Sequence, residues 1–125
     1  MSEFSHERLD VYSAAIDHLV LSDRLADALP KGRGYLADQL RRASLSICLN
    51  IAEGAGEFAH AEKARFFRMA RRSGTECVAI EHACQVLGIV AAEDSARMRS
   101  LLDRVVAMLT GMVRREVEAE AEKRS

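Results

Sequence analysis

The sequence has no tryptophan, one proline, two tyrosines and four phenylalanines among its 125 residues. Because proline is the strongest helix breaker, this scarcity predicts long helices, and no strand-like alternation of apolar and polar residues appears. No apolar run approaches the roughly 18 residues of a membrane span, and none follows a basic start as in a secretory signal. We therefore expect one cytoplasmic, helical domain without a membrane partner.

Cysteine is also scarce. The three cysteines, Cys48, Cys77 and Cys84, are an odd number in a chain without a recognisable signal segment, which argues against a disulfide framework and predicts buried thiols. The formal net charge is only −1, so overall charge indicates neither nucleic-acid nor membrane binding. The distribution is uneven, because residues 30–75 carry nine basic and four acidic side chains. The middle of the chain is therefore a basic region.

Apolar periodicity divides the chain into four helical segments, at about 7–29, 35–53, 60–87 and 95–119. The third has the most regular spacing, with one side formed by Phe66, Ala70, Ser73, Cys77, Ile80, Cys84 and Leu87. The fourth repeats this spacing through Met98, Leu102, Val105, Leu109 and Met112. Such seams belong to helices that pack at shallow angles. Because short connections make neighbouring helices antiparallel, residues 1–125 are predicted to form an all-α, up-down-up-down four-helix bundle.

Glycine and polar residues mark the expected helix ends. Gly54-Ala55-Gly56 is predicted to end the second helix and Gly88 the third, since glycine tolerates the left-handed conformation that follows a helix. Asp94 or Ser95 is a candidate N-cap of the fourth helix. The turn between the first and second helices is expected at Pro30-Lys31-Gly32-Arg33-Gly34.

The second helix has more apolar surface than a bundle needs. One stripe is formed by Leu36, Leu40, Ala43, Ile47 and Ile51, and a surplus lies outside it at Leu45, Cys48, Leu49 and Ala52. A bundle helix turns only about a third of its surface inward, so we expect these four residues to form an interface between copies of the chain. A second stripe on the first helix, Leu21, Leu25, Ala28 and Leu29, favours the same interpretation. The alternative is that the second helix lies deeper in its own bundle than the others do.

Two blocks carry a resemblance to a known family: Gln39-Leu40-Arg41-Arg42-Ala43 and Asn50-Ile51-Ala52-Glu53-Gly54, followed by Phe66, Ala70, Ser73 and Glu76. With these residues the chain resembles, from Leu9 to Val113, the bacterial four-helix bundle proteins encoded in ribosomal RNA intervening sequences. The accessory variability determinant proteins of diversity-generating retroelements are related to them. The chain departs from the pattern at Cys48 and Leu49, where relatives often have a proline, and in its sequence pI of about 6.4.

The resemblance implies a homopentamer, a ring of bundles around a central channel, with no known catalytic activity and no cofactor. For the retroelement branch it implies binding to a reverse transcriptase and to nucleic acid, RNA or DNA, through basic side chains. We therefore expect a non-catalytic, oligomeric binding or accessory protein. The alternative is a purely structural protein–protein assembly module without a nucleic-acid role.

The basic region supplies seven candidate nucleic-acid-binding residues: Arg41, Arg42, Lys63, Arg65, Arg68, Arg71 and Arg72. Guanidinium groups hold phosphates by bidentate hydrogen bonds, and repetition around a ring would multiply a weak contact. Few aromatic residues are present for base stacking, so contacts to the nucleic-acid backbone are expected. The alternative is a solvated face, or pairing with the acidic first and fourth helices of the same or a neighbouring subunit.

Two carboxylates and an amide form a second candidate group. Asn50 and Glu53 lie near the end of the apolar second helix, and Glu76 interrupts the third. A carboxylate in apolar surroundings needs a cationic partner, so we expect a polar clasp with an arginine that fixes how the helices pair. A catalytic acid is the competing interpretation.

Metal and enzyme chemistry find little support in the sequence. Glu-x-x-His spacings of the kind that build di-iron sites in helical bundles occur at Glu3–His6 and Glu57–His60, but both lie outside the expected helix centres. His18 beside Asp17 and His82 beside Glu81 are interpreted as surface pairs that complete no ligand set. No glycine-rich phosphate loop, nucleophile elbow or CxxC pair is present. No metal site is therefore predicted, and an enzyme is the least favoured class.

Overall fold

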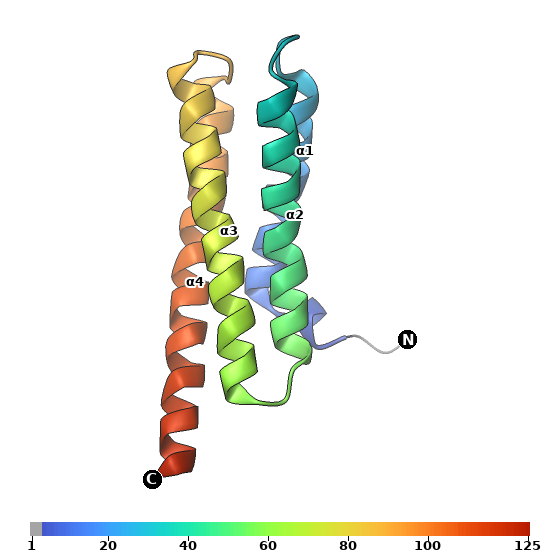
Figure 1. Ribbon diagram of the computed structural model, residues 1–125. Coiled ribbons are helices and arrows are strands. Elements are labelled where there is room, and N and C mark those ends of the chain that lie inside the picture. The colour runs from blue at the N-terminus through green and yellow to red at the C-terminus, as the bar shows by residue number, and fades with distance from the viewer. Residues whose placement is uncertain (1–3) are drawn as a thin grey trace.

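A computed structural model describes residues 4–125, which contain four α-helices and no strand. A short 3-10 helix, η1 (Ser5–Arg8), precedes α1 (Asp10–Ala28), α2 (Gly34–Gly56), α3 (His60–Val86) and α4 (Ala92–Arg124) (Figure 1). The α1–α2 and α3–α4 connections lie at one end and the α2–α3 connection at the other. None of the helices in this range is both long and apolar enough to cross a membrane.

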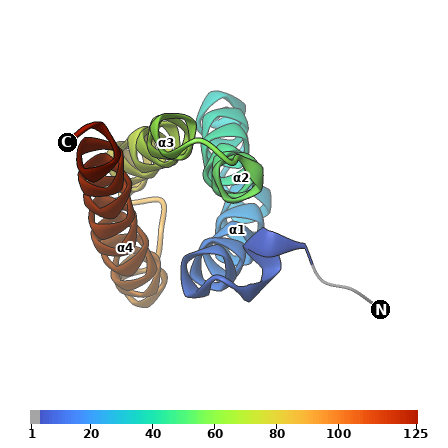
Figure 2. The same cartoon turned by 90° about the horizontal axis from the view of Figure 1, so that it is seen from below.

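The four helices lie at the corners of a quadrilateral when seen along the bundle (Figure 2). Each of α1 and α3 packs against both α2 and α4, so α1 and α3 occupy opposite corners. Long side chains from α1 and α3 can therefore meet only across the centre of the bundle. The last turn of α4 projects beyond the α2–α3 connection in Figure 1.

Only some of the helix ends have the glycine in a left-handed conformation that the sequence predicts. Gly32 has φ +93° in the turn that Arg33 N–H closes on the Pro30 carbonyl, and Gly88 has φ +69° directly after the C-cap of α3. α2 ends at Gly56, within the predicted segment Gly54-Ala55-Gly56, but the left-handed conformation predicted there is wrong, because positive φ angles occur, among residues 4–125, only at those other two glycines. The predicted N-cap of α4 is also wrong, because this helix begins earlier, at Ala92.

The core of α3 and α4 lies close to the predicted seams. Four of the five α4 residues, Met98, Leu102, Val105 and Leu109, are buried. On α3 the predicted seam is one position off at two points, and its last member, Leu87, is 44% exposed at the C-cap. Phe67 rather than Phe66 is buried, and Glu81 rather than Ile80. A carboxylate thus occupies a core position in place of an isoleucine.

The central line of α1 differs more from the prediction. Its buried residues are mainly small or polar: Val11, Ala14, Ala15, His18, Ser22, Leu25 and Ala26. The predicted stripe of Leu21, Leu25, Ala28 and Leu29 shares Leu25 with that line, and Leu21 and Leu29 are half-buried against the subunit's own core. Because three of its four residues pack in or against the subunit's own core, this stripe does not add to the surplus apolar surface, and that part of the prediction is wrong.

Candidate functional site

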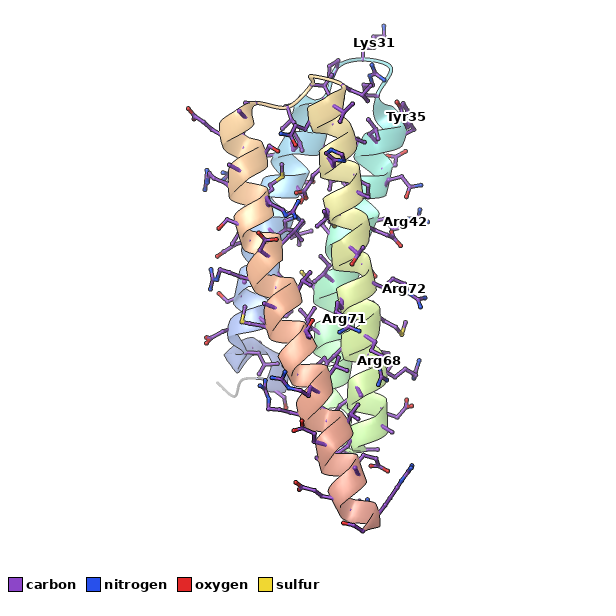
Figure 3. All side chains as sticks on the ribbon, turned by 90° about the vertical axis from the view of Figure 1, so that its left-hand side faces the viewer. Lys31, Tyr35, Arg42, Arg68, Arg71 and Arg72 are labelled. Atoms are coloured by element: carbon purple, nitrogen blue, oxygen red, sulfur yellow. The ribbon has the colours of Figure 1, made fainter. Side chains whose placement is uncertain are left out.

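Three of the seven predicted basic residues project from the same side of the bundle. Arg42 on α2 and Arg68 and Arg72 on α3 are exposed and lie along the α2–α3 side in Figure 3. Arg68 and Arg72 share a ridge because residues four apart lie one above the other on a helix. Arg71 lies beside them towards α4, where it donates a hydrogen bond to Thr110.

The same side of the bundle carries two residues that were not predicted. Lys31 lies in the α1–α2 connection and Tyr35 in the first turn of α2. They extend the row of arginines towards the end of the bundle that holds this connection (Figure 3). Tyr35 is 56% exposed, so its ring is accessible for stacking, and its hydroxyl accepts a hydrogen bond from Arg33 at 3.0 Å. In the sequence, the only indication for Tyr35 was its place at the predicted start of the second helix. We call the whole set the basic face: Lys31, Tyr35, Arg42, Arg68, Arg71 and Arg72.

The other predicted arginines and lysine are engaged elsewhere. Arg41 turns towards α1 and pairs with Asp23 and Asp27. This is the alternative of pairing with the acidic first helix of the same subunit. A rotation of about 100° per residue separates consecutive side chains on a helix, which is why Arg41 and Arg42 serve different surfaces.

Lys63 and Arg65 are held at the other end of the bundle. The Lys63 ammonium donates to the carbonyls of Gly54 and Ala55 at 3.4 and 3.3 Å, which satisfies acceptors in the last turn of α2. The Arg65 guanidinium bonds to Glu62 at 3.0 Å and lies 4.4 Å from the Phe66 ring centroid. This hydrogen bond lowers the pKa of the Glu62 carboxyl. Both cations have local structural partners.

The predicted polar clasp is not seen among the side chains that the structure describes. The Asn50 amide donates to the Ser46 carbonyl at 2.9 Å, and the Ser46 and Ser73 hydroxyls lie 2.9 Å apart, so α2 and α3 are linked by serines. Glu53 and Glu76 are exposed, and among the described side chains, which exclude residues 1–3 and the side chain of residue 8, neither takes part in an ion pair. A solvated carboxylate requires no buried partner, which removes the physical reason for the clasp.

The four predicted interface residues differ in how much of each side chain is exposed. Leu45 and Leu49 are 45% and 56% exposed, and Val20 on α1 is 44% exposed. Ala52 is half-buried. Cys48 is only 3% exposed in the lone subunit, so its assignment to an interface surface is wrong and it belongs to the core. A shallow groove between α1 and α2 contains Leu19, Val20 and Leu45.

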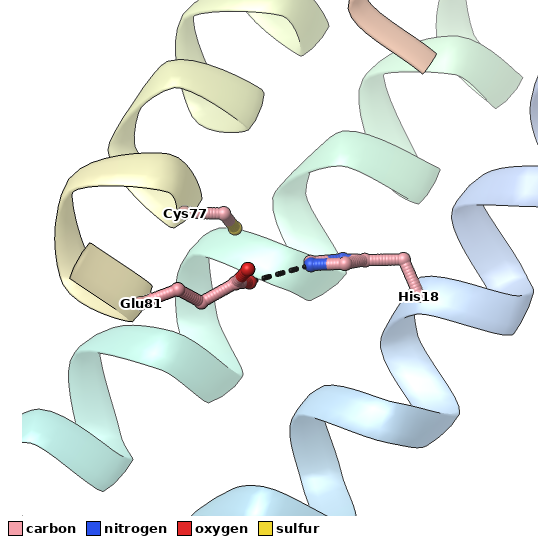
Figure 4. A group of neighbouring side chains, drawn as sticks. All are labelled: His18, Cys77 and Glu81. Atoms are coloured by element: carbon pink, nitrogen blue, oxygen red, sulfur yellow. Dashed lines mark hydrogen bonds and ion pairs between the residues drawn. The ribbon is translucent and has the colours of Figure 1, made fainter. Parts of the chain in front are cut away.

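The prediction that His18 and Glu81 belong to surface pairs is wrong, because both side chains are buried. His18 is fully buried and Glu81 is 5% exposed, and the two are hydrogen bonded to each other rather than placed in separate surface pairs (Figure 4). Their separation of 63 residues leaves no local signal in the sequence. Of the Glu-x-x-His pairs, Glu3 lies outside the described residues, and His60 bonds to Glu116 on α4 rather than to Glu57.

The three thiols are buried and free, as predicted. Burial raises the pKa of Cys48 to about 11 and also raises the pKa values of Cys77 and Cys84, with a further contribution from the Glu81 charge. Because the thiolate is the nucleophile, these cysteines are poorly suited to nucleophilic catalysis.

Comparison with curated proteins finds no match. Residues 7–111 match the family described as 23S rRNA-intervening sequence protein. The matched range begins in η1 and continues into α4, so it includes all of α1, α2 and α3. This confirms the resemblance drawn from the sequence. The chain belongs to the 23S rRNA-intervening sequence protein family.

Proposed function

We propose that this protein is a non-catalytic, oligomeric binding protein that contacts nucleic acid, or a nucleic-acid enzyme such as a reverse transcriptase, through the basic face. The observation that carries the proposal is the row of exposed arginines on the α2–α3 side, Arg42, Arg68 and Arg72. Arg71 extends this row towards α4. The net charge of the chain is close to zero, so attraction of phosphates must come from this local concentration of positive charge.

Guanidinium groups suit the phosphate backbone. Each offers a planar fork of donors that matches two phosphate oxygens, and such contacts carry no sequence information by themselves. Tyr35 is the one ring on the basic face that can stack on a base. Binding should therefore be strongly salt-dependent and tolerant of base sequence, with a single-stranded region able to use Tyr35.

Assembly is the second part of the proposal. Leu45 and Leu49 lie four residues apart on α2 and leave an exposed apolar strip beside Val20 of α1. We propose that a second copy of the chain covers this strip and that the up-down-up-down bundles close into a ring, a homopentamer by resemblance. Repeating the basic face around such a ring raises avidity without any new contact. Three free thiols favour a reducing, cytoplasmic setting.

A matched pair of charge variants tests the basic face. In one, Arg42, Arg68 and Arg72 become glutamine. In the control, Arg97, Arg104 and Arg114 become glutamine, which changes the net charge equally on exposed residues of α4. Fluorescence anisotropy of a labelled mixed-sequence single-stranded RNA is measured from about 50 to 200 mM salt.

We expect the wild type and the control to bind with similar salt dependence. Losing three phosphate contacts should reduce the log–log salt slope by about 2, at about 0.7 per contact for a single strand, and weaken binding at every salt concentration. Equal losses in the two triple variants contradict the assignment to the basic face. No binding of the wild type at the lowest salt contradicts the nucleic-acid role and favours the purely structural assembly module.

A further inference from the structure

A buried polar cluster lies at the centre of the bundle, away from the basic face. His18 comes from α1, and Cys77 and Glu81 come from α3, one helical turn apart (Figure 4). Because α1 and α3 occupy opposite corners, these side chains meet across the bundle axis. His18 and Cys77 are fully buried, and Glu81 is 5% exposed.

Packing alone does not explain this cluster. A buried ion pair is rarely more stable than well-packed apolar residues of similar volume, because both charges must lose their hydration. Here an imidazole and a carboxylate occupy two facing core positions, and a third titratable group, the Cys77 thiol, lies with them. One ligand atom from each of the three residues lies within 4.8 Å of the others.

We propose that His18, Cys77 and Glu81 form a binding site for a zinc-like divalent transition-metal ion. An imidazole nitrogen, a thiolate and a carboxylate oxygen are all zinc ligands. With a neutral imidazole, the two anionic ligands balance the charge of the cation, so the buried site is neutral overall. Calcium and magnesium are disfavoured because they require mainly oxygen ligands. The site is independent of the nucleic-acid proposal.

The distances require only small shifts of side chains. Tetrahedral zinc with bonds of about 2.0–2.3 Å places its ligand atoms about 3.3–3.8 Å apart. The His18 Nε2 to Glu81 Oε2 distance is 2.7 Å in the hydrogen-bonded pair, so these two atoms would separate by about 0.6–0.8 Å for a metal to enter between them. Any pair near the 4.8 Å limit closes by roughly 1 Å.

Ser22 supplies an outer contact of the kind that metal-binding histidines use. Its hydroxyl oxygen lies 3.5 Å from His18 Nδ1 and 3.3 Å from Nε2. A metal-bound imidazole normally donates its second ring N–H to a nearby acceptor, which fixes the tautomer. With the metal on Nε2, the proton moves to Nδ1 and is donated to Ser22, and a water is left to fill the fourth coordination position.

The metal also resolves an electrostatic conflict. A thiolate at Cys77 and the Glu81 carboxylate would be two anions enclosed side by side in the core, where like charges destabilise each other. A divalent cation between them reverses the sign of this interaction, and the thiol proton is released to solvent on binding. Since the ligands are enclosed, the ion would serve a structural role and would enter before the bundle closes, which couples binding to folding.

Cobalt(II) is a suitable probe because its thiolate complexes absorb light. The full chain is unfolded in urea, with a reductant present to keep the thiols reduced. It is then refolded with CoCl2 and desalted, and its metal content, absorption spectrum and circular dichroism are recorded. Cys77→Ala and Glu81→Gln each remove one proposed ligand. Cys48→Ala and Cys84→Ala remove the other buried thiols and serve as matched controls.

We expect one cobalt per wild-type chain, a thiolate-to-cobalt charge-transfer band, and loss of both in Glu81→Gln and Cys77→Ala proteins that retain their helices. The two control variants should keep the band. If Cys77→Ala does not refold, the isosteric Glu81→Gln variant decides. The proposal is overturned if the refolded wild type retains no cobalt, if cobalt remains without the charge-transfer band, or if the band survives removal of a proposed ligand.

Discussion

Substitution of Gly54 by alanine should destabilise the protein, although alanine is the better helix former. Gly54 is buried in the last turns of α2, where α2 and α3 come together. An added Cβ would lie 2.6 and 2.8 Å from two ring carbons of Phe67 and 3.1 Å from the Phe66 Cβ. Gly56, two residues later in the same helix, is a matched control because an added Cβ there meets nothing within 4 Å.

The magnitude follows from two opposing effects. Replacing glycine by alanine within a helix stabilises by up to about 1 kcal/mol, whereas overpacking a core costs about 1–3 kcal/mol. The Phe67 ring is only 3% exposed, so it cannot move aside into solvent. We expect Gly54→Ala to lower the free energy of unfolding by about 1–2 kcal/mol, and Gly56→Ala to leave it unchanged or raise it by a few tenths.

Urea unfolding followed by circular dichroism measures both variants at one fixed protein concentration, since assembly makes apparent stability concentration-dependent. The expected difference of about 2 kcal/mol corresponds to a separation of about 1 M in urea midpoint if the slope is near 2 kcal/mol/M. If Gly54→Ala proves as stable as Gly56→Ala, the close approach of Phe67 to α2 is incorrect.

Three further outcomes are expected. Leu45→Glu combined with Leu49→Glu should convert the assembly to 13.8 kDa monomers of unchanged helicity in sedimentation experiments, and an intact oligomer would contradict the proposed apolar contact. Because its pKa is raised to about 11, Cys48 should be alkylated at pH 8 about a hundredfold more slowly than a thiol of pKa 9, with the rate rising towards pH 11; peptide mass spectrometry measures this, and fast labelling would refute the burial. Lys63→Gln should lower stability by about 0.5–1 kcal/mol in urea unfolding, while the same change at the exposed loop residue Lys31 should have no effect.

The fourth helix was the most predictable element. Met98, Leu102, Val105 and Leu109 are large, apolar and regularly spaced, and all four are buried. The first helix was harder, because its central line contains Ala14, Ala15, His18 and Ser22. Hydrophobic periodicity emphasises large side chains, so it identified the stripe that contains Leu21, Leu25 and Leu29 and missed the small and polar residues of the central line.

For the candidate sites too, only the features that depend on a single helix could be predicted. Spacing along one helix brought out Arg68 and Arg72, because i and i+4 positions share a face whatever the tertiary structure. It could not show that Arg41 turns to carboxylates on α1 while Arg42 remains on the basic face. The pairing of His18 with Glu81 depends on which corners α1 and α3 occupy. Side-chain groups that form only after helices assemble leave no periodic trace in the sequence.

The projecting end of α4 differs from the middle of the helix in what stabilises it. The family match stops at residue 111, whereas α4 continues to Arg124, and residues 121–125 are exposed. The ion pair of Arg124 with Glu120 is local, and isolated helical turns are only marginally stable in water. Amide hydrogens there should exchange with solvent long before those of the central turns. A fluorophore attached to this projecting end would move with it and would report the tumbling of the whole particle poorly. A label for rotational measurements therefore belongs nearer the middle of the helix.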